Sequence, residues 1–282
     1  MKKSASSILL ILIFLIGLSL LLYPTVSNYW NSMHQTHAIT SYTQEVSTMS
    51  AEKYNAILDR ARAFNDNVSN RQSLYALSDE ERTEYEACLN LDSTGIMGYI
   101  EIPSIEVSLP IYHGTSDTVL NSAVGHLDWT SLPVGGKGTH CALSGHRGLP
   151  SAKLFTNLDK LAEGDIFIIR VLNEILTYEV DQIRIVNPDE TEELQIVDGK
   201  DYCTLVTCTP YGINTHRMLV RGHRIENLVD SQTVKITSDA VQVEPILIAP
   251  IIASPVLLVL LIILLLPNKK EKHRGGIHEN SK

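Results

Sequence analysis

Three side chains of types used in nucleophilic catalysis stand next to Gly- or Pro-containing segments of this sequence. Cys208 closes the apolar run 202–208 and precedes Thr-Pro-Tyr-Gly, and Arg217 opens another such run nine residues later. His146 follows a third run, within Ser-Gly-His-Arg-Gly. An imidazole can take up the proton of a thiol nucleophile and later give a proton to a leaving amine. A nearby guanidinium favours the thiolate and stabilises a developing oxyanion. The three residues together predict acyl transfer through a cysteine.

Each of these residues alone also has an ordinary structural interpretation. A buried cysteine is commonly an inert core residue, and a lone histidine commonly only makes hydrogen bonds. Their shared position at a strand end beside a loop favours the catalytic interpretation, because a strand gives precision and a loop gives access. Ser144 is a weaker candidate nucleophile, since Ala142 replaces the first glycine of a G-x-S-x-G elbow. Ser144 and Thr207 are the candidates for contacting a bound substrate.

Short apolar runs separated by turn residues make up the region that holds these side chains. Such runs predict β-strands, and Asn-Glu at 173–174 predicts a hairpin between two of them. Short helices are expected at 117–124 and 151–161. Seven or eight strands with small helical insertions in about 130 residues fit a closed barrel better than a βαβ fold. The predicted strands cover residues 97–102, 106–112, 139–143, 165–172, 175–186, 202–208 and 217–224.

Two helices are expected ahead of this region. Residues 40–64 are rich in Ala, Glu, Leu and Arg and contain neither Pro nor Gly. Ser78 and Glu81 have the spacing of a capping box, which predicts a second helix through about Cys88. Between the two helices, the segment from Asn65 to Leu77 carries Asn, Asp and Ser and is typical of a loop.

Two uncharged stretches, residues 4–23 and 246–266, lie toward the two ends of the sequence. Twenty residues at about 1.5 Å rise cover the roughly 30 Å hydrocarbon core of a bilayer. Two lysines precede the first stretch and four basic residues follow the second. Both flanks are therefore expected in the cytoplasm and residues 24–244 outside. A cleaved signal peptide is the alternative for the first stretch, but no A-x-A site follows it.

The charge of the sequence is divided in the same way. The 282 residues include 23 Lys and Arg and 32 Asp and Glu, for a net charge of -9. Residues 24–244 hold 16 of the basic and 30 of the acidic side chains. Phosphate contacts need clustered Lys and Arg, so this acidic middle argues against nucleic-acid binding. Four cysteines without a CxxC pair argue against a structural zinc site.

Three segments resemble the signature sequences of sortases, in the order in which sortases carry them. Residues 204–208, Thr-Leu-Val-Thr-Cys, match the TLxTC signature. Residues 144–150, Ser-Gly-His-Arg-Gly-Leu-Pro, are similar to the histidine segment, and residues 214–222 are similar to the arginine segment. The resemblance covers roughly residues 95–226. It is greatest to class C, the pilin-polymerising sortases of Gram-positive bacteria, which carry two membrane spans and an N-terminal helical extension.

This resemblance implies a mainly β, eight-stranded sortase barrel with a triad of Cys208 as nucleophile, His146 as general acid and base, and Arg217 for the substrate and oxyanion. The implied reaction cleaves an LPxTG-like sorting signal through a thioacyl intermediate and transfers the pilin to a lysine amine of another pilin. Pilin subunits and the membrane are the implied partners, without cofactor or metal. A sortase that attaches proteins to peptidoglycan is the alternative within the family. A non-catalytic pilus-assembly scaffold is the alternative outside it.

The resemblance and the two apolar stretches together predict six parts of the chain. Class C sortases typically close the cleft with a lid anchored by an Asp-Pro-aromatic motif, which is absent here because no proline occurs between Pro24 and Pro103. The segment from Asn65 to Leu77, with Tyr75 as an aromatic plug, is either a lid or an ordinary interhelix loop. The six parts are the cytoplasmic tail and membrane helix 1–23, the helical extension 24–94, the catalytic barrel 95–230, the juxtamembrane linker 231–245, the membrane helix 246–266 and the basic cytoplasmic tail 267–282.

The remaining cysteines and histidines near the motifs permit two further hypotheses. Cys141 lies five residues before His146, and Cys203 lies five before Cys208. If their strands are parallel neighbours, as in sortases, the two thiols approach each other, either as a disulfide Cys141–Cys203 or as two reduced core residues. His140 and His216 raise the idea of a metal site, but the side chains of His216 and Arg217, adjacent on a strand, should point to opposite faces.

Overall fold

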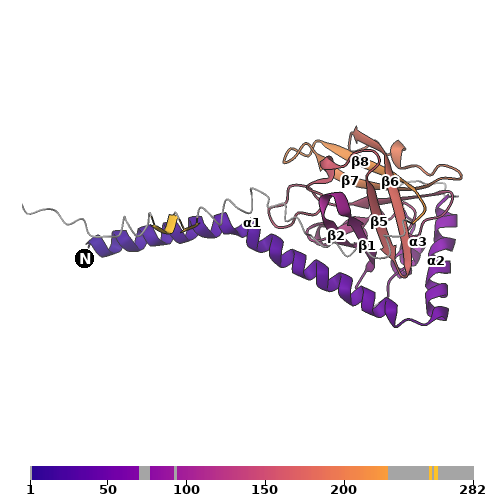
Figure 1. Cartoon of the computed structure of the whole chain (residues 1–282), viewed down its shortest axis with the longest axis horizontal. Helices are drawn as coiled ribbons and strands as arrows, with labels where there is room; N and C mark the ends of the chain where they lie inside the picture. The colour runs from indigo at the N-terminus through magenta and orange to yellow at the C-terminus, as the bar shows by residue number, and fades with distance from the viewer. Residues whose placement is uncertain (1, 70–76, 92–93, 228–253, 256, 260–282) are drawn as a thin grey trace, which may run out of the picture. The chain divides into compact units, whose positions relative to one another are not determined.

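The computed structural model describes residues 2–69, 77–91, 94–227, 254–255 and 257–259. The chain divides into two compact units, residues Val26–Ala240 and a unit made of Met1–Thr25 with Val241–Lys282. The first helix, α1 (Lys2–Ser47), begins in the smaller unit and continues into the larger one. Figure 1 shows this helix and the barrel of the larger unit.

The predicted N-terminal span lies within α1. Among the described helices, Ile8–Ser47 is the one that is long and apolar enough to cross a membrane. Pro24 lies inside the helix, and a proline is tolerated where a membrane span ends or is kinked. The second predicted span, 246–266, falls mostly outside the described residues; within it, residues 254–255 and 257–259 are helical. The second span therefore stays a prediction.

The larger unit is built around a closed eight-stranded β-barrel, as the sequence predicts. The strands follow one another around the barrel in the order β1-β2-β3-β4-β7-β8-β6-β5. Apolar side chains such as Ile100, Leu143 and Phe167 are fully buried in the barrel core. The strands are β1 (Ile96–Ile102), β2 (Val107–His113), β3 (Val124–His126), β4 (Thr139–Ser144), β5 (Ile166–Val171), β6 (Glu174–Val186), β7 (Asp201–Thr209) and β8 (His216–Arg224).

Two of the short helices differ from the prediction. In place of a helix over 117–124, α4 (Asp117–Leu120) is a single turn, and Val124 already belongs to β3, which pairs with β2 and β4. The prediction of a helix over 151–161 is wrong except for the short 3₁₀ turn η2 (Leu158–Lys160). Leu154 has a φ of +37°, which interrupts a right-handed helix. Two further short turns are η1 (Pro103–Ile105) and η3 (Glu192–Leu194).

The helical extension also departs from its predicted bounds. The expected helix over 40–64 is broken, because α1 ends at Ser47 and α2 (Ala51–Ser69) follows. Ser50 Oγ accepts a hydrogen bond from the Lys53 amide at 3.3 Å, which caps the new helix. The prediction that a loop starts at Asn65 is wrong for residues 65–69, because they form the last part of α2. The capping box of Ser78 and Glu81 at the start of α3 (Asp79–Ala87) is confirmed.

Helix α1 is tied to the barrel by side chains between residues 28 and 42. The Tyr42 hydroxyl donates to the Met97 carbonyl at 2.9 Å and accepts from the Leu172 amide at 2.7 Å. Asn31 Nδ2 donates to the Ser151 carbonyl at 2.8 Å, and Asn28 Oδ1 accepts from the Lys153 amide at 2.9 Å. These last two bonds hold residues 151–153 in a non-helical course, which the local sequence does not reveal.

Candidate active site

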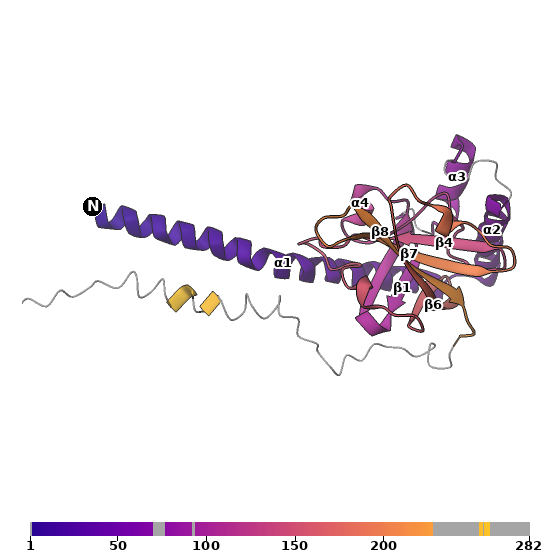
Figure 2. The same cartoon turned by 90° about the horizontal axis from the view of Figure 1, so that it is seen from above.

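Cys208 and Arg217 are directly opposite each other on neighbouring strands. Strands β7 and β8 are antiparallel, and their register pairs Cys208 with Arg217. Directly opposite residues in an antiparallel pair project to the same face, with Cβ atoms about 4.5–5.5 Å apart. Figure 2 shows β4, β7 and β8 together on one side of the barrel. The fold therefore brings together a thiol and a guanidinium that are nine positions apart in the sequence.

His146 follows β4, which runs parallel to β7. The Gly145 amide donates to the Val206 carbonyl at 3.1 Å, and Thr207 Oγ1 donates to the Gly145 carbonyl at 2.7 Å. The His146 carbonyl in turn accepts from the Phe155 amide at 3.1 Å. These bonds fix the backbone of His146 at the same end of the sheet as Cys208. The structure thus places the three predicted catalytic residues on adjoining strand ends.

Exposure separates Cys208 from the other thiols. Cys88, Cys141 and Cys203 are buried, whereas Cys208 is partly exposed. His146 and Arg217 are also partly exposed. A thiol must reach its substrate to act as a nucleophile, so Cys208 is the cysteine of the four that suits this role.

Arg217 is oriented by its own loop. Its Nη1 donates to the carbonyls of Asn214 and His216, at 3.3 and 3.1 Å. Asn214 has a φ of +62°, a left-handed conformation that asparagine adopts more readily than most residues. His216 pairs with Thr209 in the register and so faces the side of the sheet opposite to Arg217, as predicted.

An apolar strip leads along the outer face of the sheet to Cys208. Successive side chains alternate between faces, so Val206 and Cys208 share one. Val206 packs in a buried cluster with Ala142 of β4, Leu219 of β8 and Leu194 of η3. The partly buried side chains of Leu127, Trp129 and Val186 pack against this cluster. This buried cluster packs η3 and the β6–β7 connection against the strands that carry Cys208 and Arg217.

Several other predicted site residues have different surroundings. Thr207 is 2% exposed and its hydroxyl is bonded to Gly145, so it positions the His146 segment and does not face a substrate. Ser144 is partly exposed, opposite Val206. Of the proposed lid, Asn65 is buried in α2 and bonds the backbone of Leu132, while Tyr75 lies outside the described residues.

Cys141 and Cys203 are directly opposite each other on the parallel strands β4 and β7, so the predicted approach is confirmed. Both are free thiols, and the disulfide is not formed in the structure. Burial, together with a hydrogen bond to Cys141, raises the pKa of Cys203 well above its ordinary value. The two thiols lie side by side in the barrel core without a bond between them.

Two polar residues with defined contacts near the site lacked a clear sequence signal. Arg147 Nη2 donates to Asp159 Oδ2 at 2.5 Å, and its guanidinium lies 5.8 Å from the ring centroid of Tyr211. It thereby joins the segment after His146 to the loop after Cys208. His140, considered above for a metal, is bonded to protein groups through both ring nitrogens. No group of three metal-binding side chains occurs among the residues that the structure describes.

Gly145 is expected to tolerate no side chain. A Cβ there would lie 2.7 to 3.1 Å from three ring atoms of the buried Phe155. We expect Gly145→Ala to lower the free energy of unfolding by about 1–3 kcal/mol, the usual cost of overpacking a core. Urea unfolding measures this, and the double variant Gly145→Ala/Phe155→Leu, which shortens the opposing side chain, should recover part of the loss. A single variant as stable as the parent chain would contradict the packing described.

Comparison with known proteins agrees with this geometry. Residues 100–225 match the model of the sortase domain. Sortase A of Bacillus anthracis is 30% identical over 222 residues, covering 78% of this chain and 95% of that protein. Among solved structures, sortase C1 of Streptococcus agalactiae is 53% identical, with a TM-score of 0.67 over 68% of this chain and 100% of that one. Sortase C of Streptococcus pneumoniae is 43% identical, with a TM-score of 0.62 over 68% and 97%. The chain therefore belongs to the sortase family of membrane-associated transpeptidases, and class C sortases are among its structural relatives.

Proposed function

We propose that this protein cleaves an LPxTG-like sorting signal with Cys208 as the nucleophile. The thiolate attacks the carbonyl between Thr and Gly, and the carbon–sulfur bond forms as the peptide carbon–nitrogen bond breaks. His146 gives a proton to the departing glycine amine, and Arg217 donates hydrogen bonds to the oxyanion and the substrate backbone. The register pairing of Cys208 with Arg217, beside the fixed backbone of His146, is the observation that carries this proposal.

In the second half of the reaction, a lysine amine of another pilin attacks the thioester. The isopeptide bond forms as the carbon–sulfur bond breaks, which restores the Cys208 thiolate, and His146 accepts the proton that the amine loses. The amine must outcompete water, which positioning of the acceptor achieves through effective molarity. Repetition of the cycle would build a covalent pilus.

The structural similarity to class C sortases favours pilin polymerisation over attachment to peptidoglycan. Sortase C of Streptococcus pneumoniae is described in terms of its pilin substrate specificity. Sortase C of Clostridium perfringens is 45% identical, with a TM-score of 0.61 over 68% of this chain and 100% of that one, and its structure is described as containing the C-terminal cell wall sorting motif. Relatives named sortase A keep attachment to peptidoglycan as the second candidate function.

The proposed location follows from the reaction and the helix α1. Sorting signals and pili lie outside the cell, so the barrel is placed there, anchored by α1 and by a second span at 246–266. The parts 24–94, 95–230 and 231–245 then form the helical extension, the catalytic barrel and the juxtamembrane linker between the two anchors.

A competition between two acceptors tests the function. The full chain in detergent is incubated with a Leu-Pro-Glu-Thr-Gly peptide, a pilin-derived lysine peptide and a peptidoglycan-precursor peptide. The proposal predicts a product joined through the lysine Nε atom, identified by tandem mass spectrometry. A product joined only to the amine of the peptidoglycan-precursor peptide would show that the protein attaches its substrates to peptidoglycan. Pilus polymer formed at the parent level by Cys208→Ala would show a non-catalytic scaffold.

A further inference from the structure

The exposed apolar side chains of the larger unit are concentrated in two segments. Among the described residues of Val26–Ala240, eight large apolar side chains are exposed, and six of them lie within residues 26–33 of α1 or residues 211–213 between β7 and β8. Single exposed apolar residues are ordinary on a protein surface, whereas a group of them marks a surface that binds something. The six are Val26, Tyr29, Trp30, Met33, Tyr211 and Ile213, and they are 53–68% exposed.

The four exposed side chains of α1 form a stripe along the helix. Their spacing of i, i+3, i+4 and i+7 places them on one face. Asn28, Asn31 and Tyr42 project from the opposite face, where they bond the barrel. Between Lys3 and Glu45 the sequence contains no Asp, Glu, Lys or Arg. The stripe is therefore an uncharged, apolar face of α1 that points away from the barrel.

The stripe begins just after the stretch that is apolar enough to cross a membrane. That stretch ends at Tyr23, and α1 continues as one helix through Asn28. Five residues at about 1.5 Å rise place Asn28 roughly 8 Å further along the helix. The headgroup layer on each side of the hydrocarbon core is about 5–8 Å thick, and Trp and Tyr are enriched at this boundary. Tyr29 and Trp30 are thus expected at the surface of a bilayer.

The same part of α1 is joined to the segment that follows His146. Asn31 Nδ2 donates to the Ser151 carbonyl at 2.8 Å. Earlier in this segment, the ring of Tyr211 packs over Gly148, where an added Cβ would lie 3.2 Å from the nearest ring atom. Three residues separate Gly148 from Ser151, which is at most about 10 Å of chain. The connection between β7 and β8 is thereby held close to the level of α1 at which the bilayer surface is expected.

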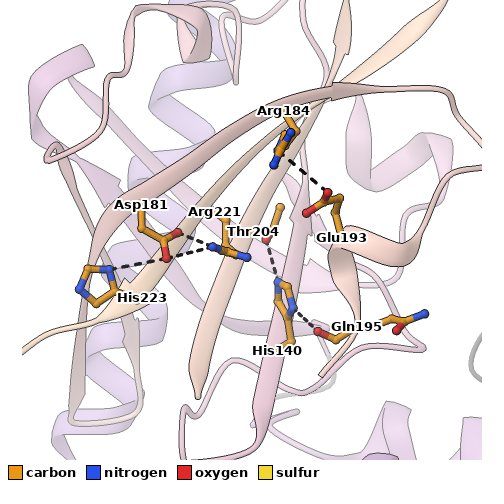
Figure 3. Close-up of polar contacts among 8 residues, drawn as sticks. All are labelled: His140, Asp181, Arg184, Glu193, Gln195, Thr204, Arg221 and His223. Atoms are coloured by element: carbon orange, nitrogen blue, oxygen red, sulfur yellow. Dashed lines mark hydrogen bonds and ion pairs between the residues drawn. The ribbon is translucent and has the colours of Figure 1, made fainter. Parts of the chain in front are cut away.

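The two connections on either side of β7 differ in charge. The β7–β8 connection, residues 210–215, has no Asp, Glu, Lys or Arg, and its Ile213 is 68% exposed. The β6–β7 connection, residues 187–200, holds five acidic side chains and one lysine. Figure 3 shows one of these acids, Glu193, beside Arg184 at 4.0 Å. Moving a carboxylate toward hydrocarbon is costly, whereas burying an apolar side chain there is favourable. Of the two, the β7–β8 connection is the one that suits contact with lipid.

We propose that the stripe of α1 and the β7–β8 connection rest together on the bilayer, with Tyr211 and Ile213 in its headgroup layer. The partner is lipid, because the stripe continues an uncharged helix that is long and apolar enough to cross a membrane. A single membrane helix can tilt, so a second contact close to Cys208 would fix the orientation of the barrel. The nucleophile would then open toward substrates tethered in the same membrane.

Quenching of tryptophan fluorescence by brominated lipid tests this contact on the full chain. One chain is placed in each phosphatidylcholine nanodisc, so that no second copy can cover the connection. The changes Trp30→Phe and Trp129→Phe remove the two natural tryptophans, of which Trp30 would report on the anchor and not on the barrel. Ile213→Trp is then the reporter. Val197→Trp is the matched control, because Val197 is also exposed but lies in the acidic β6–β7 connection.

We expect the emission of Ile213→Trp to fall roughly twofold when the lipid is replaced by phosphatidylcholine brominated on its acyl chains near the headgroup. The emission of Val197→Trp should change by less than about a tenth, since a residue outside the bilayer does not meet the bromine atoms. Absence of quenching for Ile213→Trp, or equal quenching of the two reporters, would overturn the proposal. If Ile213→Trp does not fold, Tyr211→Trp replaces it, and absence of quenching there has the same meaning.

A second measurement distinguishes contact with lipid from contact with the substrate. The nanodisc-bound chain is given a soluble Leu-Pro-Glu-Thr-Gly peptide or the same peptide linked to a lipid in the disc. Ile213→Asp should lower cleavage of the lipid-linked peptide roughly tenfold, because the site is no longer held at the membrane, and change cleavage of the soluble peptide by less than about twofold. Val197→Asp, the control, should change neither rate. An equal loss on both peptides would show that Ile213 contacts the substrate and would overturn the proposal.

The two measurements also separate this inference from the proposed function. The activity comparison rests on the proposed cleavage of a sorting peptide, whereas the quenching does not. If the parent chain cleaves neither peptide, the proposed function fails, and the quenching of Ile213→Trp alone decides whether the β7–β8 connection lies in the headgroup layer.

Discussion

Replacing Cys208 by alanine should abolish formation of the acyl-enzyme and reduce transfer by a factor on the order of 10³ or more, because the bond to the substrate carbonyl can no longer form. Cys208 is partly exposed at the end of β7, so the free energy of unfolding should change by less than about 1 kcal/mol. Peptide cleavage and urea unfolding, measured on the same sample, check the two parts of this prediction.

Cys88→Ala provides the matched control. Cys88 is fully buried beside α3, and burial raises its pKa to about 11, so it is a protonated core residue at neutral pH. This variant should lose about 1–2 kcal/mol of stability through the cavity it leaves, yet retain transfer. Transfer that survives in Cys208→Ala and disappears in Cys88→Ala would contradict the assignment of the nucleophile.

Changes at Arg217 should separate the two roles of its guanidinium. We expect Arg217→Ala to lower kcat/KM for peptide cleavage by about 10²–10³, the usual cost of losing an oxyanion donor. Arg217→Lys keeps the positive charge but not the planar fork. It should therefore retain fast alkylation of Cys208 while transfer remains strongly impaired.

The comparison needs alkylation rates as well as cleavage rates. Iodoacetamide labelling should be slowed in Arg217→Ala and close to the parent rate in Arg217→Lys. Arg224→Lys is the control at the far end of β8, where Arg224 bonds the carbonyls of Thr177 and Ile175. Equal alkylation rates in the parent and Arg217→Ala would contradict the electrostatic role, and equal cleavage rates would contradict the oxyanion role.

The barrel could be predicted because its strands carry local signals. Seven of the eight strands are apolar runs bounded by turn residues, and each was found within a few residues of its limits. Strand β3 was missed because Val124–His126 is too short to show an alternating pattern. The break between α1 and α2 was missed because residues 48–50 contain neither Gly nor Pro, and the capping bond of Ser50 alone marks it.

The candidate site was predictable where its residues stand in recognisable motifs. His146, Cys208 and Arg217 could be singled out together because each ends or opens a strand beside a loop. The contacts that hold them could not, since they depend on pairings between distant segments. Thr207 with Gly145 and Arg147 with Asp159 are separated by 62 and 12 residues. No local pattern in the sequence reports such partners.

The central claim is that Cys208 forms a thioester with the threonine of a sorting signal, and mass spectrometry tests it most directly. The full chain in detergent is mixed with a Leu-Pro-Glu-Thr-Gly peptide, stopped in acid and digested. The proposed mechanism predicts that the digestion fragment containing Cys208 gains the mass of the donor segment Leu-Pro-Glu-Thr. The rest of the donor peptide, which begins at glycine, should be released. The adduct should be released by hydroxylamine, as a thioester is. Peptide cleavage without such an adduct on Cys208, or with an adduct on another residue, would contradict the proposed mechanism.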